Sequence, residues 1–257
     1  MKKLKLDELL VTRGFISSKD EAQRYILAGK ILIDDKVITQ PGTLCELSSH
    51  IRIKEKKSQF VSRGGDKLAG FINKNNIDIK NKCVLDVGIS TGGFSDVLIQ
   101  GEALHVLGID VGYGILDYKL RKKNNLSLLE RTNAREVTKK EINDSLRKHH
   151  LTINDINLVV MDVSFISAFK IIPNLINLLQ KECEFIILIK PQFEAKKELV
   201  EFGGVITNED NIHEILTEVN KQFSTLGFEI LINEASSLKG TKGNQEHFYF
   251  VKQKYLP

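Results

Sequence analysis

One stretch constrains the fold more than any other: a strand pattern, a glycine-rich loop and a helix pattern follow one another between residues 82 and 98. Val84, Leu85 and Val87 have the continuous apolar character of a strand that is buried on both faces, as in a parallel sheet. The loop from Gly88 to Gly93 lets a ligand approach the backbone, because glycine has no Cβ. This segment predicts an α/β domain with a ligand site after its first strand.

The residues around this loop favour one class of cofactor. The loop has neither the G-x-G-x-x-G spacing of dinucleotide sites nor the Lys-Ser/Thr pair of a P-loop. Asp86 ends the strand, and its carboxylate disfavours pyrophosphate but suits a cationic amino-acid group, as in S-adenosylmethionine. Asp110 ends a second apolar strand 22 residues after Gly88, where an acid accepts hydrogen bonds from ribose hydroxyls. We expect S-adenosylmethionine here, with tight packing alone as the alternative use of the glycines.

The remaining patterns extend this domain. Strand patterns at residues 158–162 and 185–190 alternate with helix patterns at 169–179 and 210–223. Two final strand patterns, 228–233 and 246–251, are too closely linked for a parallel crossover and must pair antiparallel. A parallel sheet that ends in such a hairpin is the shape of class I methyltransferases. We therefore expect an α/β fold with a seven-stranded, Rossmann-like sheet.

The beginning of the chain has a different composition. Residues 1–67 contain 14 Lys and Arg against 9 Asp and Glu, whereas the remainder contains 23 against 24. A basic region joined to a nearly neutral one fits a nucleic-acid-binding appendage, although a solvated surface explains the same excess. Lys54–Gln59 is polar and charged, which is typical of a linker. We expect one domain with its linker at residues 1–58 and a second domain at 59–257.

Two helix patterns precede short strands in the first domain. Gly14 is a candidate C-cap of the first helix, and Ser17 or Ser18 is a candidate N-cap of the second. Ala22, Ile26 and Leu27 form the apolar face that we expect on the second helix. With strand patterns at 30–33, 37–39 and 50–53, residues 4–54 resemble a small α+β S4 RNA-binding domain. The resemblance implies contacts with RNA phosphates by Arg13, Lys19, Arg24 and Lys30.

Several classes of protein are excluded by what the sequence lacks. No run approaches the roughly 18 uncharged apolar residues of a membrane span. Asp7 and Glu8 stand where the apolar part of a secretory signal would begin, so we expect a cytoplasmic protein. Cys45, Cys83 and Cys183 are widely separated, which argues against a disulfide framework and against a zinc site.

The sequence excludes two of the chemical groups that such an enzyme could methylate. Exocyclic-amine methyltransferases usually have an Asn/Asp-Pro-Pro-Tyr motif after the fourth strand, where this chain has Asp162-Val-Ser-Phe. Methylation of a pyrimidine carbon needs a cysteine nucleophile near the strand ends, and neither Cys83 nor Cys183 suits that position. A hydroxyl acceptor remains, and it needs a base. Four charged residues stand at the ends of elements that face one crevice: Lys67, Asp162, Lys190 and Glu246.

Five segments, in order along the chain, resemble the TlyA family. They begin at Phe60 (FVSRGGDKL), Asp86 (DVGISTGGF), Asp162 (DVSFIS), Lys190 (KPQFE) and Gly243 (GNQEH). This family consists of S4-domain ribosomal RNA 2′-O-methyltransferases of the FtsJ-like superfamily, often called hemolysins. The resemblance implies methylation of a cytidine ribose 2′-hydroxyl in 16S RNA, 23S RNA or both, within ribosomal subunits. It implies neither a metal nor a membrane.

The resemblance also implies residue roles. The Lys-Asp-Lys-Glu tetrad falls on Lys67, Asp162, Lys190 and Glu246, with either lysine as the base. Arg63 joins the RNA-binding residues. The implied contacts with S-adenosylmethionine are Asp86, Gly88, Ser90, Gly92, Gly93, Phe94, Asp110 and Asn133. Two alternatives stay open: a ribosome-binding S4 protein without catalysis, and a cytolysin, for which the sequence offers no span or export signal.

Overall fold

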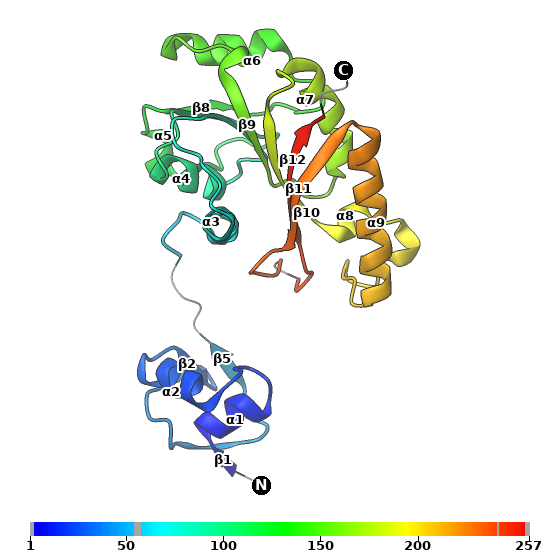
Figure 1. Cartoon of the computed structure of the whole chain (residues 1–257). Helices are drawn as coiled ribbons and strands as arrows, with labels where there is room; N and C mark the ends of the chain where they lie inside the picture. The colour runs from blue at the N-terminus through cyan, green and yellow to red at the C-terminus, as the bar shows by residue number, and fades with distance from the viewer. Residues whose placement is uncertain (1–2, 54–57, 241, 255–257) are drawn as a thin grey trace. The chain divides into compact units, whose positions relative to one another are not determined.

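The computed structural model describes residues 3–53, 58–240 and 242–254, and the chain divides into two compact units, Met1–Lys57 and Ser58–Pro257 (Figure 1). Most of the expected linker, residues 54–57, lies outside the described residues. Because the two units are separate bodies, each is described by itself.

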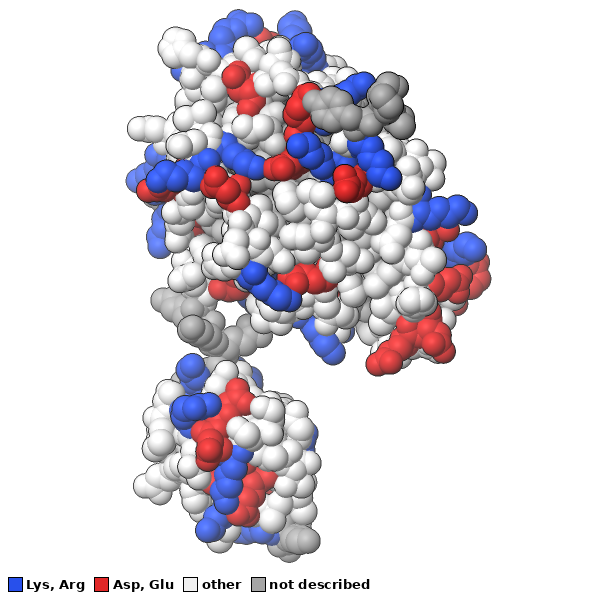
Figure 2. Space-filling view, in the orientation of Figure 1, with Lys and Arg blue, Asp and Glu red and all other residues white. Residues whose placement is uncertain are grey.

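The first unit combines two short helices with two small sheets. Helix α1 (Leu6–Thr12) precedes α2 (Lys19–Leu27), whose N-cap is Ser18: its side chain accepts a hydrogen bond from the Glu21 backbone N–H, 3.3 Å away. Lysine and arginine side chains share the visible surface of this unit with acidic ones (Figure 2). The strands are β1 (Lys3–Lys5) paired with β4 (Leu44–Glu46), and β2 (Ile31–Ile33) between β3 (Lys36–Ile38) and β5 (Ile51–Ile53).

The core of this unit corrects one sequence prediction. Ala22 and Ile26 are fully buried, as expected for the apolar face of α2. Leu27, however, is 67% exposed, so its assignment to that face was wrong. Tyr25 packs against the core instead. Consecutive residues of a helix lie about 100° apart around its axis. Leu27, the last residue of α2, therefore points away from the buried side on which Ile26 lies.

The second unit is built on a seven-stranded sheet in the order β11-β12-β10-β9-β6-β7-β8, and the prediction of this fold is confirmed. Five neighbouring strands of this sheet are parallel to one another: β10, β9, β6, β7 and β8. Strand β12 pairs antiparallel with both β10 and β11. The strands are β6 (Cys83–Val87), β7 (His105–Ile109), β8 (Leu126–Leu129), β9 (Ile156–Met161), β10 (Glu184–Ile189), β11 (Phe228–Ala235) and β12 (His247–Gln253).

Helices cover both faces of this sheet (Figure 1). Helices α3 (Arg63–Asn75), α4 (Gly93–Gln100) and α5 (Tyr118–Arg121) pack on one face, and α6 (Lys139–Leu146), α7 (Ile172–Leu178) and α9 (Glu209–Thr225) on the other. The expected helix at 169–179 is divided into η3 (Ala168–Lys170) and α7, since Pro173 stands in the first turn of α7. Shorter helices are α8 (Pro191–Glu194), η1 (Arg147–His149), η2 (Ile153–Asp155) and η4 (Lys197–Leu199).

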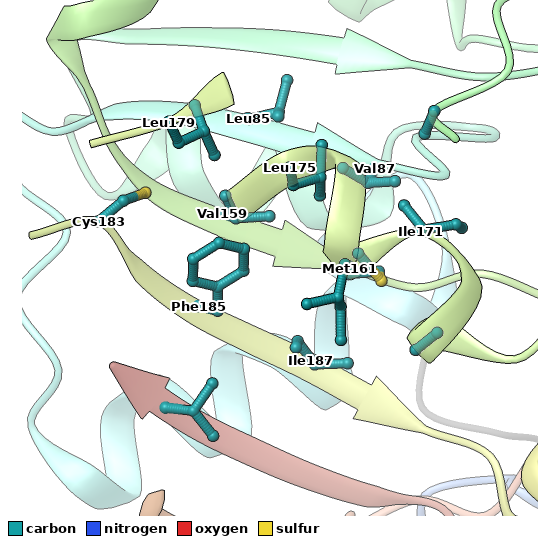
Figure 3. Packing of buried hydrophobic residues seen from close by; sticks show 14 of the residues in the cluster. Leu85, Val87, Val159, Met161, Ile171, Leu175, Leu179, Cys183, Phe185 and Ile187 are labelled. Carbon is teal, nitrogen blue, oxygen red and sulfur yellow. The ribbon is translucent and has the colours of Figure 1, made fainter. Parts of the chain in front are cut away.

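Alternate residues of the central strands supply the two cores. Figure 3 shows Leu85, Val159 and Phe185 on three neighbouring strands facing the side chains of Leu175 and Leu179. All five are buried. Burial of a leucine or phenylalanine stabilises a fold by about 1.5–3 kcal/mol per side chain. These contacts hold the strands in register, and the register fixes where each strand ends.

Candidate active site

A large cavity of about 740 Å³ lies at the carboxyl ends of the parallel strands. Asp162 follows β9 directly, Lys190 follows β10, and Glu246 immediately precedes β12. Because β12 runs antiparallel to β10 with His247 opposite Ile189, the chain direction brings Glu246 to the same edge as Lys190. Lys67 reaches this edge from α3. All four residues line this cavity.

These four residues form two ion pairs. The Lys190 Nζ lies 2.6 Å from Asp162 Oδ1 and donates a hydrogen bond of 2.8 Å to the Ser164 hydroxyl. The Lys67 Nζ lies 2.5 Å from Glu246 Oε2. The side chains of Lys67 and Lys190 are only 11% and 10% exposed. Each ammonium therefore has a carboxylate partner in a partly desolvated site, where charge interactions are stronger than in water.

The glycine-rich loop forms a wall shared by this cavity and a smaller one of about 370 Å³. Gly88 and Ser90 line both cavities. Gly88 has φ +83°, and a Cβ there would lie 2.7 Å from the backbone oxygen of Asp162. A side chain at this position would therefore be strained and would push the loop away from the strand end that carries Asp162.

Asp110 and Asn133, two of the residues for which the sequence predicts cofactor contacts, line the smaller cavity. The two Asp110 oxygens accept hydrogen bonds from the backbone N–H groups of Ser90 (2.8 Å) and Gly112 (2.7 Å). Each carboxylate oxygen has a second lone pair, so Asp110 can still accept from hydroxyl groups. Asp110 therefore fixes the loop and remains able to hold a ribose.

Two residues expected at the cofactor lie outside both cavities. Gly92 is the N-cap of α4, and Asp86 is fully buried beneath the loop, where it accepts a 2.6 Å hydrogen bond from the Ser95 hydroxyl. Burial raises the pKa of Asp86 to about 7. Its Oδ1 atom has no hydrogen-bond partner among the described residues. Asp86 supports the loop from below, whereas Gly93 and Phe94 line the large cavity.

These observations test the fit of S-adenosylmethionine. Two adjoining cavities share the loop residues Gly88 and Ser90 together with Asp162. One cavity offers a carboxylate for hydroxyl groups, and the other holds the two ion pairs. An elongated cofactor with a nucleoside at one end and a reactive centre at the other suits this arrangement, so the residues present fit the cofactor.

The sequence analysis missed an aromatic wall of the large cavity. Phe165, with φ +65°, is 91% exposed and its ring centroid lies 5.3 Å from that of Phe193. Both side chains line the cavity beside Asp162. Ser164 was also missed as a partner of Lys190. Both Phe165 and Ser164 belong to the Asp162-Val-Ser-Phe motif, so the motif was the available signal.

The basic residues expected to bind RNA are distributed over both units. Arg13 donates to the Ser49 backbone oxygen at 2.6 Å, Lys19 lies 2.9 Å from Glu8, and the Lys30 Nζ stands 4.9 Å from the Tyr25 ring centroid. Arg24 is exposed on α2. In the second unit Arg63 lines the large cavity. On the visible face of each unit, basic and acidic side chains are intermixed (Figure 2).

The buried cysteines of the second unit lie away from the two cavities. Burial raises the pKa of both Cys83 and Cys183 to about 12, and neither lines the cavities. Within residues 3–53, 58–240 and 242–254, no group of three His, Cys, Asp or Glu side chains is placed to hold a metal ion. In the same residues no helix has the length and apolar character needed to cross a membrane.

Comparisons with known proteins agree with this architecture. The chain matches the FtsJ-like methyltransferase family over residues 60–254 and the S4 domain over residues 4–51. The 16S/23S rRNA (cytidine-2′-O)-methyltransferase TlyA of Mycobacterium tuberculosis is 34% identical over 98% of this chain and 90% of that relative. Hemolysin A of Brachyspira hyodysenteriae is 34% identical over 95% of this chain and 98% of that protein. A solved structure from Streptococcus thermophilus, named a hemolysin, has 28% identity and a TM-score of 0.73, and covers 100% of this chain and 90% of that one.

Proposed function

Because the chain belongs to the TlyA family of FtsJ-like methyltransferases, we propose that it methylates a ribose 2′-hydroxyl, of cytidine, in ribosomal RNA of the ribosomal subunits. The observation that carries this proposal is the convergence of Lys67, Asp162, Lys190 and Glu246 on one cavity beside the glycine-rich loop. A hydroxyl acceptor needs a base at the reacting oxygen, and two lysines held by carboxylates supply candidates.

We propose that Gly88, Ser90, Asp110 and Asn133 hold S-adenosylmethionine. When bound, this cofactor supplies an electrophilic methyl group. The loop geometry supports the assignment, since Gly88 has no side chain and its backbone is open to the cavity. Asp86 and Gly92 act indirectly in this proposal, because they shape the loop and the start of α4 without lining either cavity.

Lys190 is the base in this proposal. After its ammonium has released a proton to solvent, the Nζ accepts the proton of the ribose 2′-hydroxyl, and Asp162, 2.6 Å away, stabilises the ammonium that forms again. Ser164 accepts a hydrogen bond from the same nitrogen and limits its rotation. Lys67 and Glu246 form the second pair, and they orient the hydroxyl and shape the field around it. Placement of the two reactants supplies most of the rate acceleration.

The aromatic wall suits the base of the target nucleotide. Phe165 and Phe193 offer apolar faces next to Asp162, and stacking of a base on such a ring contributes about 1–3 kcal/mol to binding. The first unit then supplies the main grip on folded RNA through Arg13, Lys19, Arg24 and Lys30, aided by Arg63 at the cavity. Ion pairs such as Lys19 with Glu8 must open or turn for a phosphate contact.

The test is transfer of labelled methyl groups from S-adenosylmethionine to purified ribosomal subunits, with naked ribosomal RNA as a second substrate. We expect incorporation into at least one subunit by the wild-type chain and none by Lys190→Ala. Binding of S-adenosylmethionine without transfer to any ribosomal substrate would indicate an RNA-binding protein without this activity. Failure to bind the cofactor even with RNA present would refute the proposal.

A further inference from the structure

The turn between β11 and β12 forms a wall of the large cavity that no role above uses. Lys239, Gly240, Lys242 and Asn244 line the same cavity as the four charged residues of the two ion pairs. Both lysines are exposed, and neither belongs to those pairs.

Hydrogen bonds hold the described residues of this turn on both sides of position 241. The Gly240 backbone N–H donates to the Asn244 backbone oxygen at 2.9 Å, and the Gly243 backbone N–H donates to the Gly240 backbone oxygen at 2.8 Å. The Asn244 side chain is buried; it accepts from the Ile206 N–H and donates to the Gly204 oxygen, each at 2.9 Å. The described residues next to each lysine therefore have hydrogen-bonded backbone positions, which reduces the entropy lost when the lysines bind a ligand.

The turn packs directly on the candidate catalytic residues. A Cβ on Gly240 would lie 2.6 Å from Glu246 Oε1, so a larger residue here would have to displace the carboxylate. Glu246 in turn pairs with Lys67. Lys239 and Lys242 thus lie in the chain next to a backbone segment that packs against Glu246, and they line the same cavity as this carboxylate.

The charge of the cavity wall points to an anionic ligand. Five basic residues line the cavity (Arg63, Lys67, Lys190, Lys239 and Lys242) against two acidic ones (Asp162 and Glu246). The two carboxylates are matched by Lys67 and Lys190. The Lys242 Nζ donates to the Gly203 backbone oxygen at 2.8 Å, a contact that leaves its positive charge uncompensated. The wall formed by the turn is therefore cationic.

We propose that Lys239 and Lys242 bind the RNA phosphates that flank the target nucleotide and so place its ribose 2′-hydroxyl between Lys190 and Lys67. The inference rests on the proposed function and adds a second RNA contact, within the catalytic unit itself. Ammonium groups on an anchored turn suit phosphates as point charges, and such contacts position a nucleic acid without reading its sequence.

The experiment compares Lys239→Gln/Lys242→Gln with a matched control, Lys140→Gln/Lys221→Gln, in the full-length chain. Lys140 and Lys221 are exposed on α6 and α9 and line neither cavity, so the control removes the same charge elsewhere. Methyl transfer to the ribosomal subunit is measured from 50 to 200 mM salt, and S-adenosylmethionine affinity by calorimetry. Lys239→Arg/Lys242→Arg retains both charges and tests for rescue.

We expect the Gln pair to lower kcat/KM about tenfold at 100 mM salt, chiefly through KM, with unchanged cofactor affinity. Each phosphate contact adds about 0.7–0.9 to the steepness with which log affinity for RNA falls against log salt concentration. Because the Gln pair loses two contacts, its salt dependence should be less steep than that of wild type by about 1.5. The Arg pair should approach wild-type activity. A Gln pair indistinguishable from the control, alongside an active wild-type chain, would overturn this inference alone. An inactive wild-type chain would refute the proposed function, and the inference with it.

Discussion

The pair formed by Lys67 and Glu246 can be tested by a double-mutant cycle. The two side chains are 11% and 4% exposed, so substitution of one leaves the charge of the other in a poorly solvated place. Breaking a buried pair in this way costs about 3–5 kcal/mol. We expect Lys67→Met and Glu246→Gln each to destabilise the chain by about 3 kcal/mol, the lower end, because Lys67 faces the cavity.

The double variant Lys67→Met/Glu246→Gln removes both charges together. Replacing a buried ion pair by uncharged residues often changes the stability of a protein little. We therefore expect the free energy of unfolding of the double variant to lie within about 1–2 kcal/mol of the wild-type value, with a coupling energy of several kcal/mol between the two residues. Urea unfolding of the four proteins gives these free energies. Methyl transfer should be lost in all three variants, including the stable double variant.

Two results would refute this reasoning. If the double variant is as unstable as the sum of the two single variants, the pair is not coupled and its geometry has no energetic consequence. If the stable double variant still transfers methyl groups, the pair stabilises the fold but has no part in the chemistry. Binding of S-adenosylmethionine to the double variant serves as the control for an intact loop.

Three further predictions concern other parts of the second unit. Lys190→Met should abolish methyl transfer while calorimetry shows wild-type affinity for S-adenosylmethionine; a loss of that affinity would contradict its assignment as base. Gly88→Ala places a Cβ 2.7 Å from the Asp162 backbone oxygen. We expect this variant to lose about 1–3 kcal/mol of stability and to bind the cofactor at least tenfold more weakly. Unchanged cofactor binding would contradict the role of the loop. Burial, mainly, and the neighbouring His149 lower the pKa of His105 to about 4, so below pH 6.5 the unfolded chain binds a proton that the folded chain does not bind. The contribution of His105 to stability therefore falls as pH drops from 6.5 to 4, whereas Asp86, whose pKa is raised to about 7, contributes in the opposite direction over the same range. The difference in stability between wild type and His105→Gln, followed by thermal unfolding, should therefore shift in favour of the variant as pH drops from 6.5 to 4, and a pH-independent difference would contradict the prediction.

Much of the second unit could be predicted because its signals are local. The run of apolar residues in β6 and the glycine loop after it identify a buried parallel strand without knowledge of distant residues. The loop between β11 and β12 is too short for a crossover, which was enough to predict their antiparallel pairing. The four charged residues stand at strand ends or beside them, so the sheet topology alone brings Asp162, Lys190 and Glu246 to one edge.

Other features depend on contacts that no local pattern encodes. Strand β1 pairs with β4 some forty residues later, and three-residue strands are too short to show an alternation. Asp86 sits in a strand whose two faces are both covered, so its carboxylate points beneath the loop, toward Ser95, rather than into a cavity. Phe165 has an apolar side chain but a positive φ, and its exposure follows from the backbone of its loop.

The most direct test of the account is the identity of the methylated nucleoside. Ribosomal subunits from cells that lack this protein would be treated with the purified chain and S-adenosylmethionine, digested to nucleosides and analysed by mass spectrometry. The account predicts 2′-O-methylcytidine, present with the wild-type chain and absent with Lys190→Met. A methyl group on a base instead of on ribose would contradict the central claim that Lys190, held by Asp162 and Ser164, takes a proton from a ribose hydroxyl.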